Sequence, residues 1–254
     1  MKLSIVIPVY YNEPNLWPLY KDIKEKIISR QDIECEIVMV NDGSKDKSYQ
    51  IMQEISKEDK RVRIFSLSRN FGSHAAILCG LDQCTGDCAV VKAADLQEPT
   101  ELIIEMLESW KKGFNVVLAA RRSRPESGLS KLFSNLYYWI VRKTSFPNMP
   151  KSGFDIYLID RKVIDVIKKL DEKNSALTGQ ILWSGFRTDI VYYDRLERTA
   201  GKSRWTFKKK FRLVMDTLFS FSVVPITFVS VVGALSFFAA LIWAIVIIAF
   251  KLAG

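Results

Sequence analysis

The sequence predicts an α/β domain built on a mostly parallel β-sheet, followed by a juxtamembrane amphipathic helix and a transmembrane helix. Three observations lead to this prediction. Short apolar segments rich in β-branched residues alternate with segments of helical period, which is typical of a parallel sheet covered by helices. A stretch that mixes lysines with aromatic residues lies near the C-terminal end, and a long run without charge follows it.

The elements of the sheet follow one another as far as residue 120. Residues 3–9 predict a first strand and not a secretory signal, because the apolar run is short and no small-residue cleavage site follows it. Pro99 supplies a helix start and Gly113 a helix stop, in agreement with the periodicity. We expect further strands over 36–40, 62–67, 89–92 and 115–120, and helices over 15–28, 47–57, 73–83 and 101–112.

Residues 121–151 depart from this alternation. The segment begins with basic residues, continues with an amphipathic stretch over 129–141 and ends in a turn region between Pro147 and Pro150. We therefore predict that it forms a mobile flap over a site.

The C-terminal part predicts attachment to a membrane. Residues 205–219 combine the lysines of 208–210 with Phe207 and Phe211, which is the composition of a helix in the membrane interface. Residues 223–250 carry no charge, and about 28 residues at about 1.5 Å each exceed the roughly 30 Å of bilayer hydrocarbon. We divide the chain into a domain over 1–200, an interfacial helix over 201–222 and a transmembrane helix over 223–250.

The charge of the chain indicates anionic partners. A formal net charge of +9 suits phosphates, nucleic acid or acidic lipid. Nucleic acid is the weakest of these, because the basic residues concentrate beside the apolar run and no readout motif appears. Basic residues before the run, against Lys251 after it, predict that the domain faces the cytoplasm at the inner membrane. The four cysteines lack metal-type spacing, so we expect free thiols in a reducing compartment.

Polar residues follow four successive strands of the predicted sheet. In an open parallel sheet, ligands bind outside the carboxyl ends of the strands, so these residues are the candidates for a site. Each segment alone is an ordinary loop, in which Asp42 would be a turn residue and Asp95 a helix-entry carboxylate. Their joint occurrence after successive strands predicts a binding site. The segments are Pro8 to Glu13, Asn41 to Ser44, Ser68 to Gly72 and Asp95 to Pro99.

These segments resemble a known family. The family 2 inverting glycosyltransferases of the GT-A fold are similar at Ile5 to Tyr10 with Asn12 and Glu13, at Val40 to Ser44 with Asp46, and at Ala94 to Gln97 with Pro99. The branch that uses polyprenyl phosphate, which includes dolichol phosphate mannose synthases and bactoprenol glucosyltransferases, is similar at Ser68 to Gly72, Gly153 to Asp155, and Arg198 with Gly201 to Trp205.

The resemblance implies a reaction and roles for individual residues. It implies transfer of a sugar from a nucleotide-diphosphate donor, with UDP favoured, to undecaprenyl or dolichyl phosphate for cell-surface glycan modification. It implies that Asp95 and Asp155 are catalytic and that Asp95 and Gln97 hold Mg²⁺ or Mn²⁺ and the diphosphate. The implied nucleotide-binding residues are Pro8, Tyr10, Glu13 and Asp42, to which we add Arg69, and the implied acceptor-phosphate residues are Arg198 and Lys202, to which their charge leads us to add Arg195.

The chemistry of the residues agrees with a metal at Asp95. Breaking a sugar–diphosphate bond builds negative charge on the leaving nucleotide, and a divalent cation with oxygen ligands would neutralise it. Asp95 and Gln97 would face one metal if the turn stays extended. The family commonly has Asp-x-Asp here, whereas this chain has Ala93 in place of the first carboxylate. Because magnesium is often held by one or two carboxylates and substrate phosphates, we favour an active enzyme.

The acceptor needs cations more than it needs a base. A phosphate monoester has a second pKa near about 6, so it is mostly dianionic at neutral pH. Arg195, Arg198 and Lys202 could position it, or they could form a solvated basic face that attracts anionic lipids. Asp155 could act as a base, orient a sugar hydroxyl or stabilise a helix terminus.

Other interpretations stay open. A saccharide acceptor would suit a membrane-tethered glycosyltransferase, although the motif at Arg198 argues against it. The exchange at Ala93 leaves open an inactive relative that only binds the nucleotide sugar. The identity of the sugar and of the base does not follow from the sequence, which is also compatible with a homo-oligomer.

Overall fold

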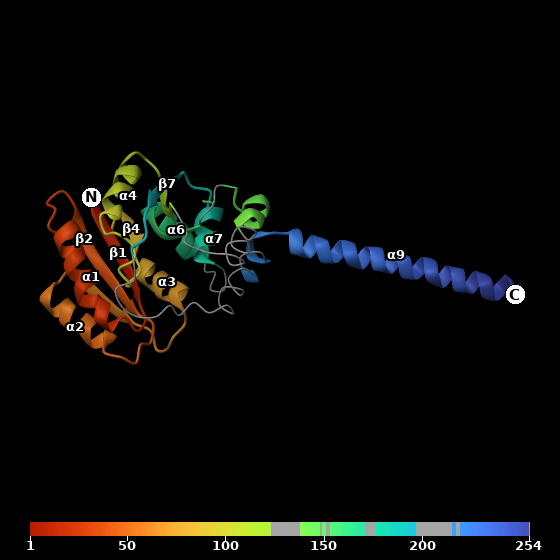
Figure 1. The fold of residues 1–254 in the computed structure, drawn as a ribbon, viewed down its shortest axis with the longest axis horizontal. Helices are drawn as coiled ribbons and strands as arrows, with labels where there is room; N and C mark the ends of the chain where they lie inside the picture. Colours follow the sequence, from red (N-terminus) through yellow and green to blue (C-terminus); the bar gives the residue numbers. More distant parts are fainter. Residues whose placement is uncertain are drawn as a thin grey trace.

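The computed structural model describes residues 1–122, 138–147, 149–150, 153–170, 176–196, 215–216 and 219–253. Figure 1 shows an α/β domain from which helix α9 extends. The part of the predicted flap over 123–137 and most of the predicted interfacial helix, with the lysines of 208–210, lie outside the described residues.

The sheet is mostly parallel, as predicted. In the part of the chain that the structure describes it has seven strands in the order β3-β2-β1-β4-β6-β5-β7. Strand β6 is antiparallel to both of its neighbours, and all other pairs are parallel. The strands are β1 (Lys2–Val9), β2 (Glu34–Asn41), β3 (Val62–Ser66), β4 (Cys88–Val91), β5 (Val116–Arg121), β6 (Phe154–Asp160) and β7 (Thr188–Tyr193).

Helices cover both faces of the sheet and create two apolar layers. Successive residues of β2 point to opposite faces, so that Ile37 packs in one layer and Val38 in the other. One layer contains residues of α1 (Leu16–Ile23), α2 (Ser48–Glu58) and α4 (Leu102–Lys111). The other contains residues of α3 (Ser73–Gln83), α6 (Arg161–Leu170) and α7 (Leu177–Trp183).

A glycine allows helix α3 to lie directly on β1. A Cβ atom at Gly80 would overlap Cγ1 of Val6 at the centre of the sheet. Helix α3 packs along β1 and β2, and the loop that precedes it is hydrogen-bonded to Asp42, directly after β2. This packing helps to position the site described below.

Several elements differ from the prediction. The helix expected over 15–28 begins with a 3₁₀ turn, Glu13–Asn15, continues as α1 and ends in a π-helical turn, Lys24–Ile28. Strands β6 and β7 and the helices α6 and α7 were not predicted. Strand β6 inserts between β4 and β5, which are consecutive strands along the chain.

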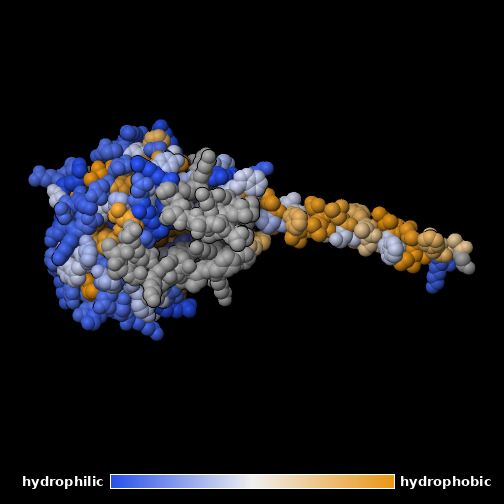
Figure 2. Space-filling view, viewed as in Figure 1, coloured by the Kyte–Doolittle hydropathy of each residue, from blue (hydrophilic) through white to orange (hydrophobic). Residues whose placement is uncertain are grey.

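Helix α9 (Val224–Ala253) is long and apolar enough to cross a membrane. It has 30 residues, and none of them is buried against the rest of the protein. Figure 2 shows a largely hydrophobic surface along this helix, in contrast to the hydrophilic surface of the domain. The helix includes all but the first residue of the span predicted over 223–250.

The segment before α9 packs on the domain through Phe221. The ring of Phe221 lies 5.2 Å from the ring of Phe146, measured between centroids. It also covers Gly179 of α7, where any Cβ atom would overlap the ring. Ser222, the next residue, is buried as well. The chain therefore contacts the α/β domain up to the start of helix α9.

Candidate functional site

A cavity of about 470 Å³ opens at the carboxyl ends of β1, β2 and β3. Two of the predicted nucleotide residues, Tyr10 and Arg69, line it. The Arg69 guanidinium lies 4.7 Å from the ring centroid of Phe71, and this stacking holds the side chain beside the cavity. The other lining residues include the aromatic rings of Tyr11 and Tyr49, the polar groups of Asn41, Ser66 and Asn70, and the Lys45 ammonium. Aromatic, amide and cationic groups together suit a base, a ribose and phosphates.

Asp42 organises the loop that forms one wall of this cavity. Its carboxylate accepts hydrogen bonds from the backbone N–H of Phe71 (2.7 Å), the backbone N–H of Gly72 (2.9 Å) and Nδ2 of Asn70 (3.0 Å). Asp42 is 2% exposed. In this structure the carboxylate therefore ties the loop after β3 to the end of β2, and Arg69 is positioned by this connection.

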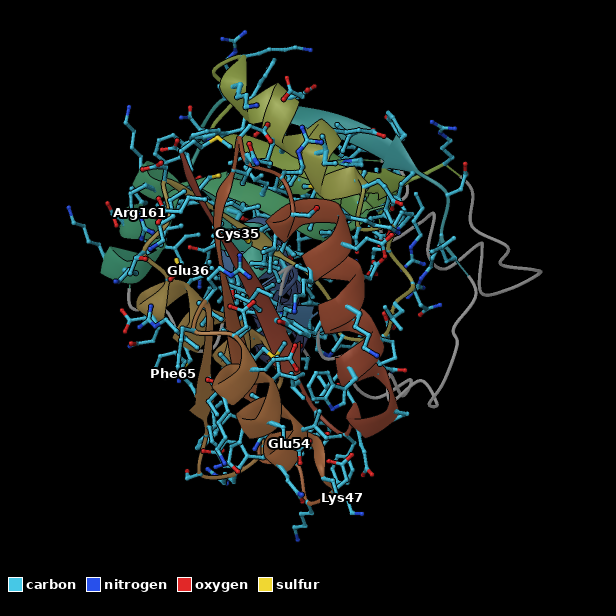
Figure 3. All side chains as sticks on the ribbon, turned by 90° about the vertical axis from the view of Figure 1, so that its left-hand side faces the viewer. Cys35, Glu36, Lys47, Glu54, Phe65 and Arg161 are labelled. Atoms are coloured by element: carbon cyan, nitrogen blue, oxygen red, sulfur yellow. The ribbon has the colours of Figure 1, made fainter. Side chains whose placement is uncertain are left out.

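The loops after β1 and β2 are tied together in a similar way. Glu13 accepts a hydrogen bond from the backbone N–H of Lys47 (3.1 Å), directly before helix α2. The backbone N–H of Tyr11 donates to Oγ of Ser44 (3.0 Å), and Tyr11 has a positive φ of 55°. Figure 3 shows Lys47 at the end of the sheet remote from Cys35 and Glu36. Pro8, half-buried, lies beside Val40 near the end of β1.

Asp95 and Gln97 lie in a turn directly after β4, the neighbour of β1. The turn is not extended, because Leu96 between them has a φ of 59°. Both side chains nevertheless face the Arg195 guanidinium. Nη2 of Arg195 donates to Oε1 of Gln97 (2.6 Å) and lies 4.0 Å from Oδ2 of Asp95. A backbone hydrogen bond from the Leu196 nitrogen to the Gln97 oxygen (2.9 Å) holds the two segments together.

A buried lysine supports this turn from inside the domain. The Lys92 side chain is fully buried, and its ammonium donates to the backbone oxygen of Glu98 (2.6 Å). Burial lowers the pKa of Lys92, and the carboxylates of Glu98 and Asp22 oppose that effect. A left-handed non-glycine residue costs about 1–3 kcal/mol unless its surroundings hold it. The hydrogen bonds from Lys92 to Glu98 and from Leu196 to Gln97 fix the residues that follow Leu96 and so support this conformation.

The turn fits a divalent cation when phosphates complete the coordination. The described residues contain no group of three His, Cys, Asp or Glu side chains that could hold a metal by itself. Of the two carboxylates in the turn, Glu98 is buried, whereas the Asp95 side chain is 18% exposed. One carboxylate with an amide oxygen and substrate phosphates is a sufficient ligand set for Mg²⁺ or Mn²⁺. Ala93 is exposed beside it, where the family commonly has a second carboxylate.

Three further site residues predicted from the sequence are described only in part or not at all. The structure puts Asp155 in β6, between β4 and β5, and does not describe its side chain. Arg198 and Lys202 lie outside the described residues. Sequence reasoning missed the contact of Arg195 with Gln97 and the buried ammonium of Lys92. The position of Lys92, directly after the apolar strand β4, was the sequence signal that could have revealed its buried ammonium.

The four cysteines and the histidine carry no catalytic arrangement among the described residues. All four thiols are free, and burial raises the pKa of Cys35 and Cys88 to about 12. Burial lowers the pKa of His74, which favours its neutral form at the start of α3. Free thiols agree with the prediction.

Comparison with known proteins identifies relatives over most of the chain. Residues 4–165 match the family described as glycosyl transferase family 2. The chain is 40% identical to the uncharacterized glycosyltransferase YkcC of Bacillus subtilis over 236 residues, which are 92% of this chain and 73% of that protein. It is 36% identical to the bactoprenol glucosyl transferase of Shigella phage SfX over 234 residues, 92% and 76% of the two chains.

Solved structures share the fold. Mannosyl-3-phosphoglycerate synthase from Rubrobacter xylanophilus superposes with a TM-score of 0.59 at 16% identity, covering 86% of this chain and 72% of that one. The mannosyltransferase PcManGT from Pyrobaculum calidifontis, solved with GDP-Man and Mn²⁺, has a TM-score of 0.55 at 14% identity and covers 78% and 57%. The chain is a GT-A glycosyltransferase and belongs to glycosyl transferase family 2.

Proposed function

We propose that the protein transfers a sugar, with inversion, from a UDP-linked donor to polyprenyl phosphate at the cytoplasmic face of the inner membrane. One observation supports the part of this proposal that concerns binding of the donor. The cavity at the ends of β1 to β3 and the turn at Asp95 lie side by side on the same edge of the sheet. A nucleotide in the cavity would extend its diphosphate toward Asp95. The bactoprenol glucosyl transferases among the relatives and the apolar helix α9 support the acceptor half.

The residues suggest how the reaction proceeds. An oxygen of the acceptor phosphate forms a bond to the anomeric carbon, while the bond from that carbon to the donor diphosphate breaks and the nucleoside diphosphate leaves with the electron pair. Asp95, with Gln97, would hold the divalent cation, which neutralises charge on the leaving group. The acceptor phosphate is already mostly dianionic, so Asp155 would orient a sugar hydroxyl or act as a base.

Transfer of radiolabel from UDP-sugars into organic-extractable lipid tests the proposal. The purified full chain should label polyprenyl phosphate in the presence of Mg²⁺ or Mn²⁺. Label that appears only in a water-soluble saccharide would support the tethered saccharide transferase instead. Donor binding without turnover over several metals and acceptors would indicate an inactive relative.

Replacement of Arg198 or Lys202 with alanine should raise the KM for polyprenyl phosphate about ten- to a hundredfold. Each charge-assisted contact to phosphate contributes roughly 1.5–3 kcal/mol, whereas a solvated basic face contributes far less per residue. Donor binding should hardly change. Lys202→Arg should recover part of the loss, because the charge is kept.

Steady-state kinetics with a short-chain acceptor in detergent measures this effect. Lys209→Ala is the matched control, since it should weaken membrane association and leave the acceptor KM unchanged. Loss of donor binding in the Arg198 or Lys202 variants would show that these residues do not serve the acceptor.

Ala93→Asp should tighten Mn²⁺ binding by several-fold to about tenfold. Position 93 is exposed beside Asp95, so the new carboxylate has room and adds a charged ligand. Electron paramagnetic resonance of free Mn²⁺ measures the affinity directly, and Ala93→Asn controls for size. An unchanged Mn²⁺ affinity would mean that the metal does not bind beside this turn.

A further inference from the structure

The contact between Arg195 and the turn at Asp95 has no role in the function proposed above. The guanidinium donates to the amide oxygen of Gln97 at 2.6 Å and lies 4.0 Å from the Asp95 carboxylate. It thus occupies the two side chains that would hold a cation. The Arg195 side chain is 30% exposed, which leaves part of the guanidinium accessible from solvent.

The position of Arg195 is set by the backbone and not only by its own side chain. The Leu196 nitrogen donates to the Gln97 oxygen (2.9 Å), and Nε2 of Gln97 donates to the Leu196 oxygen (3.4 Å). The end of β7 is thereby fixed to the turn after β4, across nearly a hundred residues of sequence. Because the backbone is fixed here, the Arg195 guanidinium stays within reach of any diphosphate that binds beside Asp95.

The charge around the turn also favours a second cationic group, besides the metal ion, to bind the diphosphate. With alanine at position 93, the carboxylates of Asp95 and Glu98 in the turn are balanced by the cations of Arg195 and the buried Lys92. A nucleoside diphosphate carries about two to three negative charges, and the negative charge on its leaving oxygen increases as the sugar departs. Arginine presents a planar fork of donors that matches two phosphate oxygens.

We propose that Arg195 binds the diphosphate of the donor: its guanidinium rests on Gln97 and Asp95 in the free protein and moves to the phosphate oxygens when the nucleotide binds. The inference rests on the proposed function and deepens it. It places Arg195 on the donor side of the site, whereas the charge pattern of the sequence predicted a contact with the acceptor phosphate. Arg195 and the metal ion would compete for the turn before the donor binds and would act on the same diphosphate afterwards.

Two binding measurements on the full chain in detergent test this inference, and they should change in opposite directions. Calorimetry with UDP and GDP identifies the nucleotide that the wild type binds. Arg195→Ala should weaken that affinity about ten- to a hundredfold with or without Mn²⁺, and leave binding of the matching nucleoside unchanged. Mn²⁺ alone should bind Arg195→Ala several-fold more tightly than the wild type, because the competing guanidinium is gone.

Two further variants sharpen the test. Arg195→Lys should recover part of the nucleotide affinity, since the charge is kept and the fork is lost. Arg187→Ala is the matched control, because Arg187 is an exposed arginine that precedes the other end of β7. It should bind nucleotide and Mn²⁺ like the wild type. Unchanged nucleoside binding shows that the cavity of each variant is folded.

Other outcomes would overturn the inference in distinguishable ways. Wild-type affinity for the diphosphate in Arg195→Ala, with a raised KM for polyprenyl phosphate, would return Arg195 to the acceptor. An unchanged affinity for both diphosphate and Mn²⁺ would show that the contact with Gln97 is only structural. A wild type that binds neither UDP nor GDP would overturn the proposed function itself.

Discussion

Asp95→Asn should lower turnover by at least about a hundredfold while the protein stays folded. Asp95 is the partly exposed carboxylate of the turn after β4, since Ala93 supplies none and Glu98 is buried. The exchange removes the negative charge that a divalent cation needs and keeps the size of the side chain. Loss of one group that stabilises charge in the transition state costs about 2.7–4 kcal/mol, which is a hundred- to a thousandfold in rate.

The measurement is turnover over a full titration of Mg²⁺ and Mn²⁺, together with Mn²⁺ binding by magnetic resonance. Asp82→Asn makes the same chemical change at an exposed carboxylate that pairs with Lys168 on the surface, and it should be neutral. Near-normal turnover of Asp95→Asn at any metal concentration would remove Asp95 from the catalytic site.

Asp42→Ala should destabilise the domain by roughly 3 kcal/mol and weaken donor binding by more than tenfold. Its buried carboxylate accepts hydrogen bonds from Asn70, Phe71 and Gly72, and the alanine would leave these donors without their acceptor. The loop after β3 would be released, and Arg69 would lose its place beside the cavity. Asp42→Asn should lose less, because one oxygen remains an acceptor.

Thermal unfolding in detergent and calorimetry with the nucleotide separate the two effects. Asp46→Ala is a useful comparison, since its carboxylate accepts the N–H of Ser48 at the start of α2 and does not contact the loop after β3. Its donor affinity should stay within about twofold of the wild type. A stable Asp42→Ala protein with full donor affinity would show that the loop is held by other contacts.

Local sequence patterns predicted the strands β1 to β5 of the sheet. The strands β1 to β5 alternate with helices, and each alternation is visible within a window of a few residues. Strand β6 lacks such a signal. It pairs with β4 and β5 in antiparallel fashion after a long stretch of sequence, and periodicity does not report which strands pair across such a distance. The late strand β7 was missed for the same reason.

The candidate site was predictable where its residues follow strands. Asp42 and Asp95 stand at carboxyl ends of parallel strands, and this position alone marks them. The partners of these residues were not predictable. Asp42 turned out to hold a loop whose backbone donors carry no sequence signature. Arg195 reaches Gln97 across the sheet, and the strained Leu96 between the two predicted metal ligands precedes residues that are held by hydrogen bonds from distant parts of the chain.

The packing of Phe221 on the domain determines where the chain can be cut. A fragment that ends at residue 200 loses the ring that covers Gly179 and contacts Phe146. The apolar surface uncovered in this way would favour aggregation of the truncated protein. A fragment that ends after Ser222 keeps the ring in place and omits helix α9. Water-soluble versions intended for crystallisation should therefore stop between Ser222 and Val224, and not at the apparent end of the sheet.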